Sequence, residues 1–173
     1  NAFAVQGGPL ADDAAVRQAL DDAGWALAQK LGVTALEYRC PMALDAGPGW
    51  VAKENVYAGF KRPLGTTRDD NLKAIPRKQR AEVRRSLEFD LDVRIGRDVQ
   101  DLTAHFNVYA TSVRNLGTPV FSPRLFVELL AAYGADADIL TVSHAGQPIA
   151  SVLSLYHKGV VLPYYGGGTQ DAR

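Results

Sequence analysis

The 173-residue sequence has a single cysteine, no excess of charge of either sign and no long apolar run. Because Cys40 stands alone, no disulfide can form within the chain, which fits a reducing compartment. The 19 Lys and Arg residues balance 19 Asp and Glu residues, so only local charge can indicate a charged partner. No stretch approaches the ~20 apolar residues that span a bilayer, and the first residues do not read as a signal peptide. These absences predict a cytoplasmic protein without a transmembrane segment.

The common catalytic signatures are missing as well. The sequence has no Gly-x-Ser-x-Gly motif, no Walker loop and no Rossmann fingerprint. The histidines His105, His144 and His157 lack metal-ligand spacing, and no Cys-x-x-Cys pair accompanies them. A histidine near a cleft could act as a general base, but a structural role is the stronger interpretation. The sequence therefore indicates no metal and no tightly bound cofactor, and it identifies no catalytic residue.

What is present is the composition of a globular protein, with 47% apolar and 22% charged residues. Helical periodicity and capping residues predict helices over residues 12–31, 76–87, 98–116 and 122–133. Alternating or short apolar runs predict strands over residues 34–40, 55–61, 91–95, 138–144, 148–156 and 160–165. The turns Ala145-Gly146 and Lys158-Gly159 are short enough for hairpins. The second half thus reads as strand, helix, helix and three-stranded meander, an α/β (α+β) arrangement with a mixed, mainly antiparallel sheet flanked by helices.

Four stretches carry a resemblance to a known family. They are Asn71–Arg80 (NLKAIPRKQR) extended by Arg84 and Arg85, Asn115–Phe126 (NLGTPVFSPRLF), Pro148–Leu155 (PIASVLSL) and Leu162–Gly166 (LPYYG). In order and spacing they resemble the FemAB-related acyltransferases found beside exosortase/PEP-CTERM and exopolysaccharide systems in bacteria. The resemblance covers most of the chain and is densest over residues 68–168.

This resemblance implies a pair of lobes with the acetyltransferase-like (GNAT) fold. Residues 1–65 would be the C-terminal part of a first lobe, and residues 66–173 the N-terminal part of an incomplete second lobe. The best-known members transfer an amino acid from aminoacyl-tRNA onto a peptidoglycan precursor. The implied acyl donor is therefore aminoacyl-tRNA or acyl-CoA, and the implied partner is a phosphate-bearing envelope or glycan precursor, or tRNA itself.

The basic segment is the first candidate site. Six Lys or Arg residues and a single acid lie between Lys73 and Arg85. At about 100° per residue, Arg77, Arg80 and Arg84 share one stripe of a helix. Together with Lys73, such a stripe can hold phosphates through charge-assisted, often bidentate hydrogen bonds. The alternatives are a solvated helix face, or pairing with four nearby acids, Glu82, Glu88, Asp90 and Asp92.

The connector Gly117-Thr118-Pro119 is the second candidate. A short turn between two helices can present the Thr118 hydroxyl and the Phe121 ring at the mouth of a cleft. The alternative is a plain helix connector in which Phe121 is a hydrophobic plug.

The third candidate is the end of the last strand. By strand alternation Tyr164 and Tyr165 would face opposite sides, so at most one could line a given cleft. Gly166, Gly167 and Gly168 could cradle a phosphate through backbone N–H groups, or form a flexible turn. They lack the Arg/Gln-x-x-Gly-x-Gly/Ala pattern by which acetyl-CoA enzymes hold pyrophosphate, which argues mildly against coenzyme A as donor.

Three hypotheses about function remain open at this point. The leading one is a FemAB-type N-acyltransferase acting on a cell-envelope or exopolysaccharide precursor. The second is a non-catalytic module that binds an anionic ligand through the basic helix, and the third is an acetyl-CoA-dependent acetyltransferase. Acyl transfer to an amine needs positioning and oxyanion stabilisation rather than a covalent intermediate, so the absence of a catalytic triad does not separate them.

Overall fold

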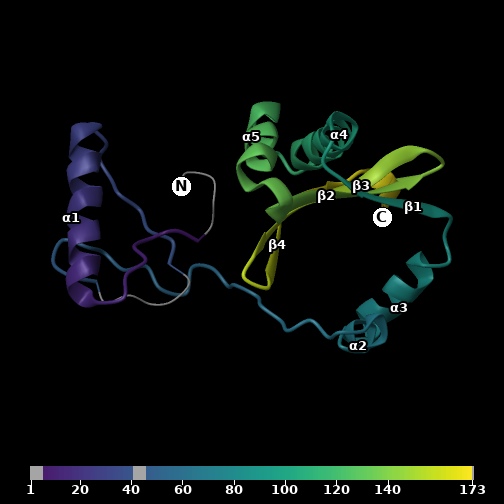
Figure 1. Ribbon diagram of the computed structural model, residues 1–173, viewed down its shortest axis with the longest axis horizontal. Coiled ribbons are helices and arrows are strands. Elements are labelled where there is room, and N and C mark those ends of the chain that lie inside the picture. The colour runs from purple at the N-terminus through teal and green to yellow at the C-terminus, as the bar shows by residue number, and fades with distance from the viewer. Residues whose placement is uncertain (1–5, 41–45, 173) are drawn as a thin grey trace. The chain divides into compact units, whose positions relative to one another are not determined.

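The chain divides into two compact units, residues 1–64 and 65–173. The computed structural model describes residues 6–40 and 46–172 (Figure 1). The division lies beside the boundary that the sequence predicts at residues 65–66. The assignment of the first unit to an earlier lobe stays a prediction.

The first unit contains one long helix, α1 (Ala14–Lys30). Asp13 caps it by accepting a hydrogen bond from the Val16 amide at 2.8 Å.

The predicted strand at 34–40 is reduced to a single antiparallel bridge between Gly7 and Arg39. The strand predicted at 55–61 is wrong: Asn55 adopts a left-handed φ of 57°, and described residues 46–64 form no strand. A strand needs a pairing partner as well as an apolar pattern, and this segment finds none.

The second unit contains the sheet and the remaining helices. Its elements follow the order α2 (Arg68–Lys73), α3 (Arg77–Ser86), β1 (Leu91–Gly96), α4 (Val99–Asn115), α5 (Pro123–Tyr133), η1 (Gly134–Asp136), β2 (Ala137–His144), β3 (Gln147–His157), β4 (Val160–Gly168) and η2 (Gln170–Ala172). Helix α2 is not among the helices that the sequence predicts. Thr67 starts this short helix by accepting from the Asp70 amide at 3.1 Å.

The sheet has the strand order β1-β2-β3-β4, and each neighbouring pair is antiparallel. Ala145 and Gly146 have φ of 49° and 75°, and Lys158 and Gly159 have φ of 45° and 75°. Positive φ at both central residues marks the type I′ turn, whose twist matches that of a hairpin. The predicted meander and the predicted fold class are therefore confirmed.

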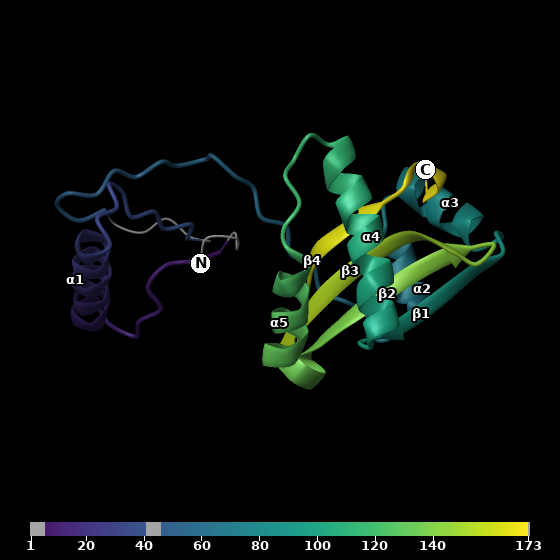
Figure 2. The same cartoon turned by 90° about the horizontal axis from the view of Figure 1, so that it is seen from above.

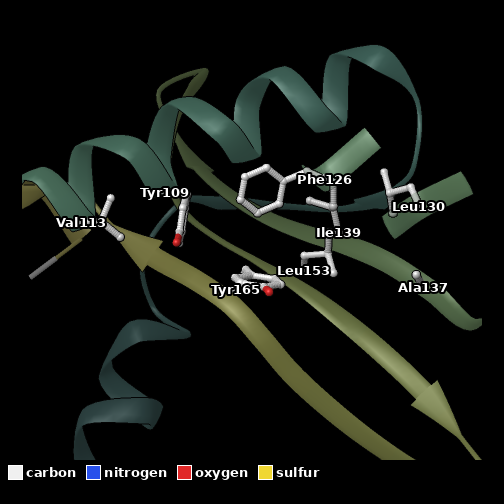
Figure 3. Close-up of a cluster of buried hydrophobic side chains, with 8 residues drawn as sticks. All are labelled: Tyr109, Val113, Phe126, Leu130, Ala137, Ile139, Leu153 and Tyr165. Atoms are coloured by element: carbon white, nitrogen blue, oxygen red, sulfur yellow. The ribbon is translucent and has the colours of Figure 1, made fainter. Parts of the chain in front are cut away.

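Helices α4 and α5 cover one face of this sheet, and α2 and α3 lie on its other side (Figures 1 and 2). The core between α4, α5 and the strands is a cluster of eight buried side chains (Figure 3), Tyr109, Val113, Phe126, Leu130, Ala137, Ile139, Leu153 and Tyr165. Phe126 is its centre: it is fully buried and meets the Tyr109 and Tyr165 rings at 5.2 and 5.5 Å.

The start of α4 is fixed by a charge cluster. Asp98 and Asp101 form a reciprocal capping box, and Arg94 of β1 donates to both carboxylates. The Arg94 hydrogen bond lowers the pKa of Asp101, which is only 2% exposed. A side chain at Gly96, the last residue of β1, would clash with the Asp101 carboxylate, which explains glycine at this position.

Helix α4 also approaches the last strand closely. A Cβ built on Gly167 would lie 2.5 Å from the Ser112 Cβ and 3.6 Å from the Tyr109 Cα. Glycine at position 167 is thus explained by helix packing rather than by loop flexibility.

We expect Gly167→Ala to lower the free energy of unfolding by about 1–3 kcal/mol, because the new methyl overpacks this contact. Urea denaturation measures the loss. Gly59→Ala is the matched control, since a Cβ there meets no atom within 4 Å. Ser112→Gly should offset part of the loss. Strict additivity of Gly167→Ala and Ser112→Gly in the double variant would contradict the proposed contact.

Candidate functional site

A hollow of about 510 Å³ opens where α4 runs into the α4–α5 connector. Its lining is mostly small or apolar with two hydroxyls and one cation: Ala110, Thr111, Arg114, Gly117, Thr118, Pro119 and Val120. Thr118, which the sequence predicts at the mouth of a cleft, is one of the residues that line this hollow. Neither the Thr111 nor the Thr118 hydroxyl has a hydrogen-bond partner among the described residues.

Local hydrogen bonds shape the connector that forms this hollow. The Gly117 amide donates to the Arg114 carbonyl at 3.0 Å, and the Thr118 amide donates to the Val113 carbonyl at 2.9 Å. This pair is a Schellman motif, and it requires the left-handed φ of 73° that Gly117 adopts. Ser122 then caps α5 by accepting from the Arg124 amide. The turn is therefore fixed by its own sequence.

A second, smaller hollow of about 190 Å³ adjoins the first through Thr111. It is lined by Ala104, Asn107, Val108, Thr111, Gln147, Pro148 and Thr169. The Thr169 hydroxyl oxygen is buried and has no hydrogen-bond partner within residues 6–40 and 46–172. Such an unsatisfied buried group is costly, so a bound molecule that hydrogen-bonds there would be favoured.

The glycine stretch leads to this second hollow. Gly166, Gly167 and Gly168 lie in β4 and pair with Val152, Ser151 and Ala150, so they form neither a free loop nor a turn. Strand β4 is an edge of the described sheet, and an edge strand leaves every second backbone N–H unpaired. The stretch ends at Thr169, whose own amide donates to the Ile149 carbonyl at 2.8 Å.

The predicted aromatic residues belong to the core instead. Tyr165 is buried, and the Tyr164 ring lies 4.7 Å from it and packs against the same cluster. Strand alternation had put the two rings on opposite sides. A register shift between Leu153 and Ser154 of β3 interrupts the alternation at this point. Phe121 packs edge-on against Tyr165 at 6.0 Å and lines neither hollow.

The basic residues form a separate surface. Lys73 ends α2, Arg77, Arg80 and Arg84 lie on α3, and none of them lines either hollow. Arg80 donates through Nε and Nη2 to the Ile75 carbonyl at 3.1 and 2.9 Å. No ion pair joins the α3 cations to the four acids that sequence proximity offered, Glu82, Glu88, Asp90 and Asp92. The anion-binding role of this surface stays a prediction.

Residues 74–173, more than half of the chain, match the family described as "Acetyltransferase (GNAT) domain". The chain belongs to the GNAT acetyltransferase family. Among curated proteins, none matches it at a significant level. The FemAB-related subgroup that the sequence resembles is a finer assignment than this family match.

The GNAT match spans β1 to β4 with α4 and α5, so it includes both hollows. Among residues 6–40 and 46–172, no helix is long and apolar enough to cross a membrane. The same residues hold no group of three His, Cys, Asp or Glu side chains that could bind a metal ion.

Sequence reasoning missed most of the lining of the GNAT domain's two hollows. Asn107, Thr111 and Arg114 follow one another at helical spacing on α4, opposite the apolar stripe that carries Tyr109 and Val113. This polar stripe could have identified the three residues from the sequence. The sequence around Gln147 and Thr169 has no such pattern, because only the folding of β3 and β4 against α4 brings these two residues together.

His105 is a structural residue of the core. It is fully buried, its Nδ1 lies 3.0 Å from the Ser151 Oγ, and the Ser151 hydroxyl donates to the Leu140 carbonyl at 3.1 Å. If Nδ1 carries the proton it donates to Ser151, and Nε2 is then a buried acceptor without a described partner. Burial lowers the pKa of His105 from 6.5 to about 4. This ring therefore cannot reach a substrate in either hollow.

We expect the neutral His105 to make stability depend on pH. Its pKa is lower in the folded chain than the ordinary 6.5, so the unfolded chain takes up the proton first as pH falls. Stability should be full above pH 6.5 and should fall by about 3 kcal/mol as the pH drops from 6.5 to 4.

Urea denaturation at a series of pH values measures this loss. His105→Gln should be less stable at neutral pH and should lose the decline between pH 6.5 and 4. His157→Gln is the control, because that side chain is exposed at the end of β3. An unchanged decline in His105→Gln would show that another group causes it.

Proposed function

We propose that this domain is an N-acyltransferase whose reacting groups meet between the α4–α5 connector and the end of β4. The observation that carries the proposal is the GNAT match over residues 74–173, which contains the sheet and both adjoining hollows. The larger hollow would take the acceptor, and the smaller one, beside β4, would lie next to the acyl donor.

The reaction needs little chemistry from side chains. The amine of the acceptor attacks the acyl carbonyl, and a tetrahedral oxyanion forms and then expels a thiolate or an alkoxide. The amine proton goes to the leaving group by way of solvent, which yields an amide and a thiol or an alcohol. Unpaired N–H groups at the Gly-rich edge of β4 would stabilise the oxyanion. The polar groups on α4 would orient the amine.

Two donors fit this mechanism. GNAT domains typically take their acyl group from acyl-CoA, which supports a thioester donor despite the absence of the usual Arg/Gln-x-x-Gly-x-Gly/Ala pyrophosphate pattern. The resemblance to FemAB-related proteins supports aminoacyl-tRNA, an ester donor. The α3 cations would meet phosphates of a cell-envelope or exopolysaccharide precursor, or of tRNA, on the cytoplasmic side.

An activity assay with both donors tests the proposed function. Purified chain is incubated with a panel of amines and either acetyl-CoA, with thiol release recorded, or aminoacyl-tRNA, with deacylation recorded. We expect amine-dependent release from one donor. Calorimetry with coenzyme A decides the donor separately: heat of binding supports the thioester, and its absence leaves the aminoacyl ester. No amine-dependent release from either donor would overturn the acyltransferase proposal.

A non-catalytic anion-binding module is the second candidate function. The observation that favours it is the surface of α3, where Arg77 and Arg84 have no ion pair among the described residues. On this hypothesis the fold holds an anionic glycan or nucleic acid and performs no transfer.

We expect Arg77→Gln/Arg84→Gln to weaken binding of a 12-base single-stranded oligonucleotide about tenfold or more at 50 mM salt, and to flatten its salt dependence. The melting temperature should not change, because neither side chain makes a described hydrogen bond or ion pair. Arg124→Gln, an exposed arginine of α5, is the control. Arg80 is left intact, since it holds the Ile75 carbonyl. An unaltered affinity of the double variant for the oligonucleotide would contradict the anion-binding role of α3.

A further inference from the structure

We propose that Arg114 is the specificity-determining residue of the larger hollow, and that it recognises a single carboxylate or phosphate on a partly apolar acceptor. This assignment to the acceptor rests on the proposed function. The hollow has one charged lining residue, and no acidic side chain lines either it or the adjoining one. An anionic group is therefore the charge that it can accommodate.

The Arg114 guanidinium is available to a ligand. No acidic side chain of the described residues pairs with it, whereas Arg94 and Arg124 are each tied to a carboxylate. It is also not needed to satisfy the end of α4. The amides of Leu116, Gly117 and Thr118 already donate to three carbonyls of the last turn, those of Ser112, Arg114 and Val113. The planar fork of arginine can then bind a carboxylate or phosphate through two parallel hydrogen bonds.

The two hydroxyls beside it suit the same ligand. Thr103, earlier on α4, returns its hydroxyl to the Val99 carbonyl at 2.7 Å. Thr111 makes no such bond, and neither does Thr118, so both hydroxyls can donate to an anion held at Arg114. Their positions do not depend on loop mobility, because Thr111 is helical and the Schellman motif fixes Thr118.

The remainder of the lining selects an apolar group. Ala110, Gly117, Pro119 and Val120 are four of the seven lining residues and offer no polar side chain. Pockets of this kind bind by apolar contact and use a few polar groups to set orientation. The ligand class is therefore a small amphiphile with one anionic end, and a purely cationic or neutral acceptor would leave Arg114 without a partner.

A set of isosteric fragments tests this inference on the full chain. Hexanoate and hexyl phosphate are titrated into ¹⁵N-labelled protein, with hexylamine and hexanol as the cationic and neutral counterparts. We expect both anions to shift the amides of residues 110–120 with millimolar affinity, and the counterparts to bind at least about tenfold more weakly. Comparison of the two anions shows whether a carboxylate or a phosphate is preferred.

Variants of Arg114 form the second part of this binding experiment. Arg114→Gln should weaken both anions about tenfold or more, and Arg114→Lys, which keeps the charge without the fork, should have an intermediate effect. Arg124→Gln should bind as the unmodified chain does. If Arg114→Gln loses its fold, the comparison rests on Arg114→Lys and on the fragment series. Equal binding of hexylamine, shifts outside residues 110–120, or unchanged affinity in both Arg114 variants would overturn the inference.

The acyl-transfer assay separates this inference from the proposed function. Anion binding at Arg114 without amine-dependent release from either donor overturns the function and retains the subsite. Transfer that continues while neither anion binds overturns the subsite alone. Where both hold, Arg114→Lys should raise the KM for an anionic acceptor with little change in kcat, and it should leave a neutral amine unaffected.

Discussion

The structure depends on how closely α4 lies against the last two strands. The contact is possible because Gly167 has no side chain where Ser112 and Tyr109 approach it. That approach brings Tyr109 onto Phe126 and Tyr165, so the aromatic core and the position of α4 are determined together. Both hollows are bordered by the opposite side of the same helix. A shift of α4 would therefore change the core and the candidate site at once.

Helix α4 is held at both ends by local chemistry. Arg94, Asp98 and Asp101 fix its first turn to β1, and the Gly117 turn ends it and directs the chain into α5. Between these points one side of the helix is apolar and the other carries amide, hydroxyl and guanidinium groups. A rigid helix that supplies core residues from one face and site residues from the other holds its polar groups in place. Ligand binding then does not have to order a flexible loop, which would cost conformational entropy.

The charged surface of α3 is a different kind of feature. Its cations lie outside both hollows and are free of ion pairs with the nearby acids, whereas Arg114 lies inside a hollow that is mainly apolar. Long-range attraction of a polyanion and recognition of one anionic group are separate tasks, and the two proposals assign the first to the α3 cations and the second to Arg114. Attraction of that kind weakens with salt, whereas a contact inside a hollow is screened less.

The sequence by itself determined α1, α3, α4 and α5, the three-stranded meander and the hairpin turns, because periodicity, caps and turn residues are local signals. The GNAT-like class followed from the resemblance of four sequence stretches to a known family, and α2 was not predicted. It also located Thr118, since a Gly-Pro connector is readable without its surroundings. Only the tertiary structure decided that Tyr164 and Tyr165 both reach the core, that the glycines are strand residues, and that residues 55–61 form no strand. Only it brought Arg114, Gln147 and Thr169 to adjoining hollows. Strand pairing, register shifts and helix packing join residues far apart in the chain, and no local pattern encodes those partners.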